Sequence, residues 1–144
     1  MAAWNTVIAA IRSRGESLWP GLESAVPVKW PNDNDFALPY AVNAALPWLM
    51  IEVRWNGGGF MSLGAPGSNL VRREGHIWCH AFVAQGVGDE RAHQLAARAA
   101  GMFEGQDFSG ILCDAAMPGG EADSEDGNYF GQSVAIPFDF DETA

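Results

Sequence analysis

The chain has 144 residues, of which 48% are hydrophobic and 18% are charged. This composition predicts a packed core in one domain spanning residues 1–144 and argues against global disorder. No apolar run approaches the roughly 20 residues that a membrane-spanning helix needs, and the first 14 residues lack the pattern of a secretory signal. We therefore expect neither a membrane protein nor a secreted precursor.

The charged residues are unevenly distributed. Eight basic residues face 18 acidic ones, so the formal net charge is −10. All eight basic residues lie within residues 1–103, whereas residues 104–144 carry ten acids and no lysine or arginine. A nucleic-acid-binding domain needs a basic stripe to neutralise phosphates, and none is visible. The acidic segment is interpreted as a solvated loop and tail, which could also repel nucleic acid or meet a basic partner.

The first half of the chain predicts one helix, two strands and a glycine-rich arm. Apolar residues at helical spacing predict a helix over residues 2–14, with Gly15 as its stop. A short strand is expected over residues 26–30. Alternating side chains predict a longer strand over residues 48–55. Residues 56–70 hold five glycines and one proline, so they form either a long flexible loop or an extended hairpin arm.

The second half predicts a helix between strands. Residues 72–83 carry apolar bulk on both faces, which is typical of a central strand covered on two sides. Asp89 is a suitable N-cap for an alanine-rich helix that runs to about Phe103. The remaining elements are a short strand over 111–115, an acidic glycine-rich loop over 116–128, a closing strand over 129–140 and a frayed acidic tail over 139–144.

These elements predict an α+β fold. We expect a small mixed or antiparallel sheet of about four to five strands, packed with two helices. The glycine-rich arm over residues 56–70 would extend from this body.

Histidine and cysteine do not form a recognisable catalytic or metal-binding pattern. His76 and His80 share one face of a strand, but four residues of strand separate them by roughly 13 Å, too far for one ion. Cys79 points to the opposite face from His80, which argues against a nucleophile–base pair. Cys79 and Cys113 both lie in apolar runs and are expected to be buried free thiols in a reducing compartment.

The remaining polar motifs are also weak. The acidic residues of the 116–128 loop lack the ligand order of an EF-hand. The turn Gly86-Val87-Gly88 precedes a helix, but Asp89 and Glu90 would repel a phosphate there. We therefore expect no catalytic residue, no metal and no cofactor, and interpret the protein as a non-enzyme.

Six tryptophans are many for a chain of this length. Four lie on predicted elements, where core packing is the default: Trp4, Trp48, Trp55 and Trp78. Trp19 and Trp30 lie in irregular segments, and either core packing or an interface role fits them.

Several segments stand in a particular order along nearly the whole chain. The first two are Lys29-Trp30-Pro31-Asn32, after the first helix, and the strand Pro47-Trp48-Leu49-Met50-Ile51-Glu52-Val53. Next comes Arg73, followed by the strand Gly75-His76-Ile77-Trp78-Cys79-His80-Ala81-Phe82-Val83. The last are the turn Gly86-Val87-Gly88 before Ala92, Leu95, Ala96 and Phe103, and Gly127-Asn128-Tyr129 before the strand Val134-Ala135-Ile136-Pro137-Phe138. In this order they resemble the tail terminator (tail completion) proteins of long-tailed bacteriophages and related tail-like particles.

The resemblance implies a structural protein of the virion tail, assembled in the host cytoplasm. Such subunits form a ring, usually of six copies, that caps the tail tube, ends its polymerisation and joins the tail to the head. The implied partners are further copies of the chain, the tail tube protein and the head–tail connector protein. DNA would pass through the ring without specific binding, and no membrane is involved. Six copies at −10 each would carry about −60, which would keep passing DNA from sticking.

A closed ring of one kind of subunit needs two different patches on each subunit. The candidate interface residues are Asn56, Gly58, Phe60, Met61, Leu63, Arg72, Arg73 and Trp30. The candidate acidic residues, which would face either the lumen or a neighbour's Arg72 and Arg73, are Glu121, Asp123, Glu125 and Asp126. Two other interpretations stay open: a head–tail connector or other tail-completion subunit, and a monomeric acidic protein-binding module of the inhibitor or immunity type.

Overall fold

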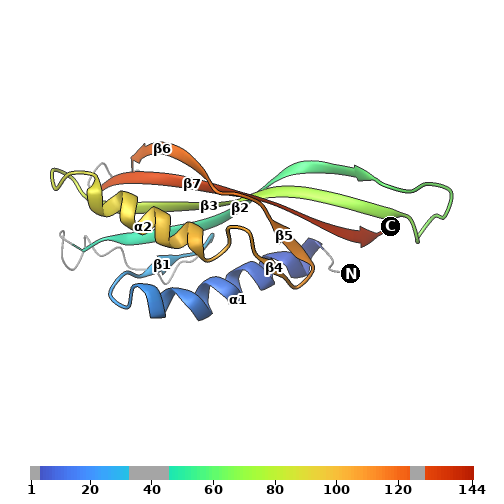
Figure 1. The fold of residues 1–144 in the computed structure, drawn as a ribbon, viewed down its shortest axis with the longest axis horizontal. Coiled ribbons are helices and arrows are strands. Elements are labelled where there is room, and N and C mark those ends of the chain that lie inside the picture. Colours follow the sequence, from blue (N-terminus) through green and yellow to red (C-terminus); the bar gives the residue numbers. More distant parts are fainter. Residues whose placement is uncertain (1–3, 33–45, 124–128) are drawn as a thin grey trace.

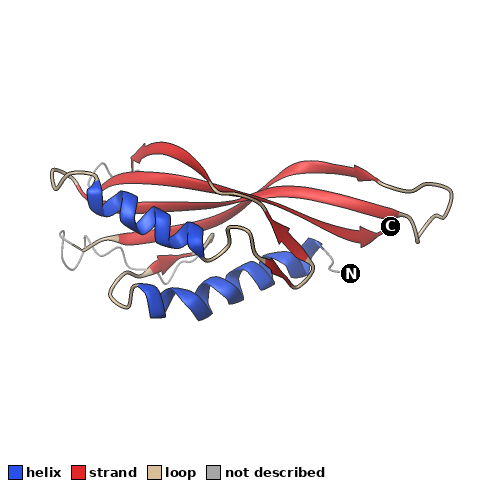
Figure 2. Ribbon diagram, in the orientation of Figure 1, coloured by secondary structure: helices blue, strands red, loops and turns tan. Residues whose placement is uncertain are grey.

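The structure, a computed structural model, describes residues 4–32, 46–123 and 129–144. Its elements are α1 (Trp4–Leu22), β1 (Val28–Lys29), β2 (Trp48–Phe60), β3 (Leu70–Ala84), α2 (Glu90–Gly101), β4 (Asp107–Phe108), β5 (Ile111–Cys113), β6 (Met117–Asp123) and β7 (Tyr129–Thr143). Figure 1 shows two helices beside a long twisted sheet, and Figure 2 shows the same arrangement by type of element. The predicted α+β class with two helices is confirmed.

The sheet is larger than predicted. Within the described ranges it has seven strands in the order β1-β2-β3-β7-β5-β4, and β6 also pairs with β7. Only β1 and β2 run parallel among the described pairs. The expectation of four to five strands was too low because β4, only two residues long, was not expected and β6 lies in the segment predicted as a loop.

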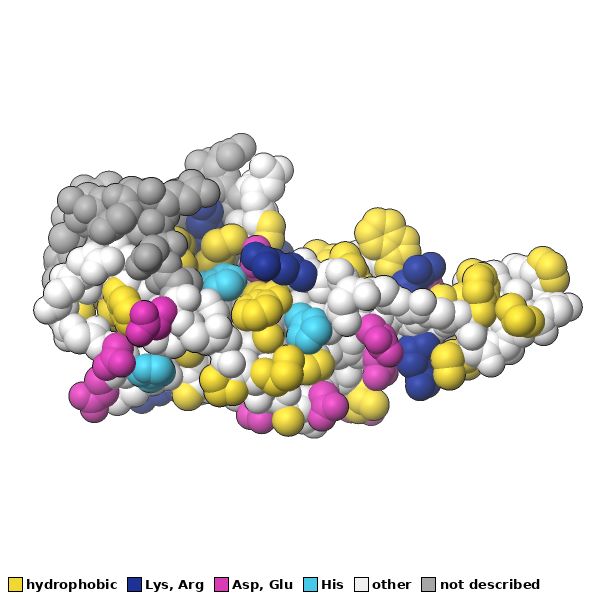
Figure 3. Space-filling model, turned by 90° about the horizontal axis from the view of Figure 1, so that it is seen from above, with side chains coloured by type: hydrophobic (Ala, Val, Ile, Leu, Met, Phe, Trp, Pro, Cys, Tyr) yellow, Lys and Arg dark blue, Asp and Glu magenta, His cyan; other side chains and the backbone are white. Residues whose placement is uncertain are grey.

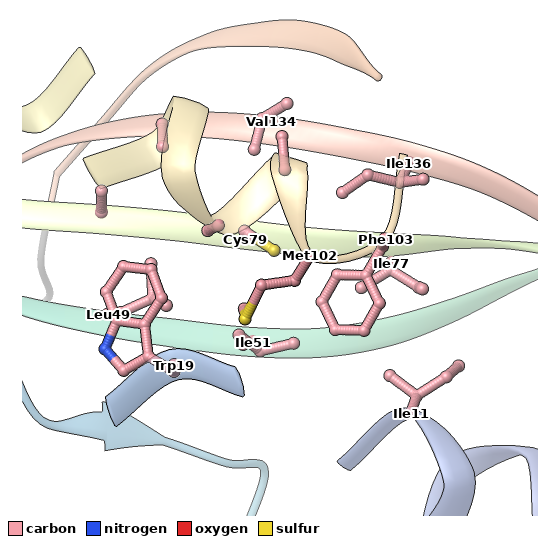
Figure 4. Close-up of a cluster of buried hydrophobic side chains, with 14 of the residues drawn as sticks. Ile11, Trp19, Leu49, Ile51, Ile77, Cys79, Met102, Phe103, Val134 and Ile136 are labelled. Atoms are coloured by element: carbon pink, nitrogen blue, oxygen red, sulfur yellow. The ribbon is translucent and has the colours of Figure 1, made fainter. Parts of the chain in front are cut away.

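Both helices cover the same face of the sheet. The buried core joins Ile11 and Trp19 of α1 and Leu95 of α2 to Leu49, Ile51, Ile77, Cys79, Val134 and Ile136 of the three long strands. Figure 4 labels all of these side chains except Leu95 and shows them between the helices and the sheet, with Met102 and Phe103 among them. A smaller cluster of Trp48, Phe82 and Tyr129 lies on the other face.

Helix α1 continues past the predicted stop at Gly15. A Cβ at this position would lie 2.8 Å from Cη2 of Trp30, so glycine serves close packing here and does not end the helix. Trp30 is 6% exposed and belongs to the core. The structure therefore favours the core alternative for Trp30, and its interface role stays a prediction. Trp19 is also buried, and its Nε1 donates to the Val26 carbonyl oxygen at 2.8 Å.

Three strands extend beyond the helices as an arm, defined here as residues 55–75 with 138–144. Past an irregularity between Trp55 and Gly57, β2 continues to pair with β3 as far as Phe60 opposite Val71. Strand β7 borders β3 along its whole length. Of the two alternatives for residues 56–70, the structure has the hairpin, and Figure 1 shows it projecting from the body.

The chain after residue 138 is not a frayed tail. Strand β7 runs to Thr143, and Ala144 and Asn69 exchange backbone hydrogen bonds of 2.9 and 3.0 Å. The predicted loop over residues 116–128 likewise contains a strand, β6. Gly119 allows this edge strand to pass over Trp78, because a Cβ there would lie 2.8 Å from the indole ring. No helix among the described residues is long and apolar enough to cross a membrane.

Candidate interaction surface on the arm

The outer end of the arm presents apolar side chains in an ordered turn. Met61 and Leu63 are 56% and 82% exposed, and neighbouring Phe60 is 57% exposed. The turn, residues 61–69, is named the tip. It is held by the amide of Leu70 donating to Ser62 Oγ at 2.7 Å and by the amide of Ala65 donating to Asn69 Oδ1 at 3.0 Å. The exposed apolar groups are therefore displayed by a hydrogen-bonded scaffold.

A hollow of about 450 Å³ lies along one face of the arm. We name it the aromatic groove; its lining residues are Trp4, Trp55, Gly57, Gly58, Gly59, Phe60, Val71, Arg73 and Ala144. Trp4 and Trp55 meet edge to face, with ring centroids 6.5 Å apart. Trp55 is also in edge contact with Phe138 and Phe140, at 5.5 and 5.7 Å, so its ring is held in place from below.

Trp4 and Trp55 were predicted to be core residues. This prediction is wrong, because both side chains are exposed. Trp4 is 54% exposed and Trp55 is 39% exposed. The sequence offered no local signal for this, because both residues follow the periodicity of their own element. Their exposure depends on the arm extending past the end of the helices.

The glycines of the groove have different roles. A Cβ on Gly58 would lie 2.3 Å from the Arg72 carbonyl oxygen, so glycine is needed for β2 to pair closely with β3. Gly57 has a φ of +129°, which favours glycine. Gly59 has neither constraint, and nothing lies within 4 Å of its Cβ position. Gly59 pairs with Arg72, so this open space lies on the side of β2 away from Phe60 and Val71.

The outer edge of β2 lacks a neighbouring strand along the arm. Strand β1 pairs with β2 only at Leu49 and Met50, and no other described strand borders that edge. Unpaired strand edges offer a row of backbone donors and acceptors to another chain. No charged residue or proline lies between Trp55 and Phe60 to block such an approach.

The arginines of the arm are already partnered within the arm. Arg72 donates to both carboxylate oxygens of Asp141, at 2.8 and 3.0 Å, and Arg73 pairs with Glu142. The hydrogen bond from Arg72 lowers the pKa of Asp141 below its ordinary value, and Asp141 raises the pKa of Arg72. Glu142 also accepts the backbone amide of Trp4 at 3.1 Å, which ties α1 to the arm. These arginines therefore have acidic partners in their own chain, and a contact with a neighbour's acidic loop stays a prediction.

The other predicted site residues are dispersed. Asn56 lies beside the arm, with its Oδ1 3.0 Å from Nδ1 of His76. Glu121 is exposed on β6, and Asp123 ends that strand, toward the end of the sheet away from the arm in Figure 1. Glu125 and Asp126 lie outside the described residues. Among the described residues, β6 with Glu121 is therefore not brought together with the predicted interface residues of the arm.

A second hollow at the base of the arm is acidic, and sequence reasoning missed it. It has a volume of about 530 Å³ and is lined by three carboxylates, those of Glu74, Asp114 and Asp139. Glu74 and Asp139 are directly opposite on β3 and β7, an arrangement that places like charges side by side. The exposed side chain of Leu112 lines the same hollow.

A chain of side-chain hydrogen bonds crosses the sheet on the face away from the helices. His80 Nδ1 lies 2.6 Å from Ser133 Oγ, and His80 Nε2 lies 3.1 Å from Glu52 Oε1. Glu52 is also paired with Arg54 at 2.6 Å. Ser133 is only 7% exposed, so this acid–histidine–hydroxyl order ties three strands together and does not present a nucleophile to solvent. Among the described residues, no three potential ligands are grouped to hold a metal ion.

Both cysteines are free and buried, as predicted. Burial raises the pKa of Cys79 to about 12. Burial also raises the pKa of Cys113, to about 11, although nearby Arg14 opposes the shift. Neither thiol is therefore a reactive thiolate in the folded protein.

The comparisons with known proteins identify the fold alone. No protein-family model and no curated protein matches the chain. Among solved structures, one chain aligns with a TM-score of 0.68 over 100% of this chain and 99% of its own length, at 19% sequence identity. Its description states no function. At this sequence identity the structural similarity supports the α+β fold but says nothing about activity.

Proposed function

We propose that the protein is a tail terminator subunit that forms a ring, of six copies by the resemblance, at the end of a phage or phage-like tail tube. The ring would stop tube polymerisation and join the tail to the head–tail connector. In this role the protein belongs to the virion tail and is not an enzyme. The proposal starts from the order of segments in the sequence.

One structural observation supports it most: a single chain carries two different apolar surfaces that no other described segment covers, the tip and the aromatic groove. Heterologous contacts between unlike patches generate rings when the rotation between subunits closes. An acidic lumen would suit the passage of DNA, and the chain has a formal net charge of −10. Glu121, exposed on β6, is the acid of the predicted group whose side chain the structure describes, and it is the candidate for a lumen or a partner surface.

The first test is the assembly state. Light scattering on a size-exclusion column across a wide concentration range should give a closed species near 92 kDa, six times the chain mass of 15.4 kDa. Negative-stain images of that peak should contain rings with a central hole. Open chains of increasing length, or a dimer that does not grow, would contradict the proposal.

The second test is capping. The tail tube protein from the same particle is polymerised with and without the purified subunit, and tube lengths are measured by electron microscopy. A terminator should shorten the tubes and label one end. An unrelated acidic protein of similar mass is the control. If tubes grow unchanged while the subunit binds the connector instead, the head–tail connector becomes the better assignment.

The acidic hollow favours one alternative, a monomeric module that binds a basic partner. In that case the chain would stay monomeric at every concentration and bind an arginine-rich peptide in calorimetry. Replacing Glu74 and Asp139 by glutamine and asparagine would weaken that binding. If the chain forms rings, and the two replacements leave its assembly unchanged, this result would argue against the alternative.

A further inference from the structure

We infer that the tip of one copy docks into the aromatic groove of a second copy, with Leu63 as the inserted side chain. The inference rests on the proposed function and deepens it, because it names the contact that joins neighbouring subunits. Its occupant is a second copy of this chain, and the contact is heterologous.

The tip has the character of an inserted group. Leu63 is the most exposed large hydrophobic side chain of the described residues, and Met61 stands close to it on the same turn. Residues 61–69 contain no charged side chain. Figure 3 shows the narrow end of the arm covered by hydrophobic and uncharged side chains, with charged groups only nearer its base. Burying this leucine removes its apolar surface from water, which favours the contact.

The aromatic groove has the character of a receptor. Its volume of about 450 Å³ falls within the range of roughly 300–1,000 Å³ found for binding pockets. Two aromatic rings, those of Trp4 and Trp55, stand at its inner end. The free edge of β2 runs beside it, so an incoming backbone could also pair with this strand.

A tip cannot reach the inner end of its own groove. Trp55 and Phe60 are five positions apart along β2, which is roughly 17 Å of extended chain. The tip follows Phe60 directly and is pinned by the amide of Met61 donating to the Leu70 carbonyl oxygen at 2.7 Å. Folding Leu63 back to Trp55 would break the hairpin. A tip that enters the groove must therefore come from another molecule.

The distribution of charge on the arm favours a second copy of the chain, over a different protein, as the occupant of the groove. The outer arm, residues 55–73 with 140–143, carries two arginines and two acids, and each arginine pairs with one of these acids. This region is electrically neutral in a chain whose formal net charge is −10. Two acidic copies repel each other at most approaches, and a neutral, apolar meeting point reduces that repulsion. A basic partner would find no unpaired carboxylate here among the described side chains.

Two variants separate the two halves of the contact. Leu63→Asp removes the inserted side chain but leaves the groove. Trp4→Gln removes one of the two tryptophan rings of the aromatic groove but leaves the tip, and the 54% exposure of Trp4 lets the fold accept it. Leu63→Asp and Trp4→Gln are called the two arm variants. The matched controls are Val87→Asp, at an exposed turn away from the arm, and Leu22→Gln, at a 46% exposed apolar residue at the other end of α1 from Trp4. Circular dichroism and a thermal midpoint check that all four fold.

Assembly is measured by light scattering across concentration. Each arm variant alone should lower the association constant at least about tenfold and remain monomeric where the wild-type chain forms rings. Both controls should assemble like the wild type. Mixed in equal amounts, the two arm variants should form a heterodimer near 31 kDa, twice the chain mass of 15.4 kDa, because one intact tip meets one intact groove. The dimer cannot grow, since its remaining tip and groove are both disabled.

The other outcomes overturn the contact. A Leu63→Asp chain that still forms rings would leave the proposed function intact and refute the docking. Self-dimers of either variant would indicate a symmetric tip-to-tip or groove-to-groove contact instead. A mixture that stays monomeric also refutes it. Conversely, a wild-type chain that forms open filaments, together with a mixed heterodimer, would support the contact and overturn the terminator assignment.

Discussion

Gly75 lies at the base of the arm on the central strand β3, and its replacement by alanine tests how tightly the three long strands cross there. A Cβ at Gly75 would lie 2.8 Å from Cζ of Phe138, 2.9 Å from its Cε1 and 2.9 Å from the Arg54 carbonyl oxygen. Gly75 is not among the glycines with positive φ. The backbone conformation therefore permits alanine, and only the available space opposes it.

Two effects of opposite sign decide the result. In an open strand, alanine in place of glycine stabilises by about 0.5–1 kcal/mol, because the unfolded chain loses freedom. At Gly75 the added methyl group must move a buried ring and a backbone carbonyl, and such overpacking costs about 1–3 kcal/mol. The packing cost is larger. We expect Gly75→Ala to lower the free energy of unfolding by about 1–2 kcal/mol, or the thermal midpoint by roughly 3–8 °C.

The assay is urea unfolding followed by tryptophan fluorescence and circular dichroism. Gly59→Ala is the matched control on the same hairpin, and it should be neutral or slightly stabilising because its Cβ meets nothing within 4 Å. Phe138→Leu removes the ring that causes two of the three close contacts. The double variant should therefore be more stable than additivity predicts, by about 1 kcal/mol. Equal stability of Gly75→Ala and Gly59→Ala, or strict additivity with Phe138→Leu, would refute the reasoning.

Three further predictions concern the core, the thiols and the ion pair of the arm. Trp30→Ala should cost about 3–5 kcal/mol in urea unfolding of the monomer; a loss of assembly at unchanged monomer stability would mean that Trp30 is an interface residue after all. Neither Cys79 nor Cys113 should react with a thiol reagent at pH 8 until denaturant is added, and fast labelling of the folded chain would contradict their burial. Because Arg72 lowers the pKa of Asp141, this pair stabilises above the unfolded carboxyl value near 4 and is lost as the pH falls through the lower folded value. The thermal midpoint of Asp141→Asn should therefore lie below that of the wild type at pH 7 and converge with it toward pH 2, and a pH-independent gap would count against the ion pair.

Local pattern was enough to predict the α+β class, two helices, the long strands and the burial of both cysteines. These features follow from periodicities of 3.6 and 2 residues, which operate over a few neighbours in the sequence. The apolar residues of the tip could also be singled out, since Met61 and Leu63 stand in a glycine-rich segment without helical or strand periodicity.

Other features depended on residues that are distant in the sequence. Gly15 looked like a helix stop, but the indole of Trp30 packs against it and the helix continues. Residues 139–143 looked like a frayed acidic tail, yet they form a strand because β3 offers them partners, including Arg72 across 69 positions of sequence.

The candidate site shows the same division. The sequence by itself determined which residues are apolar, acidic or conformationally free, and hence which segments were able to form the arm. Only the tertiary structure decided that Trp4 and Trp55 lie together in an exposed groove, that the arginines of the arm are neutralised in their own chain, and that Trp30 is buried. The physical reason is that each of these depends on strand pairing and on where the helices end, and strand pairing joins residues that no local pattern connects.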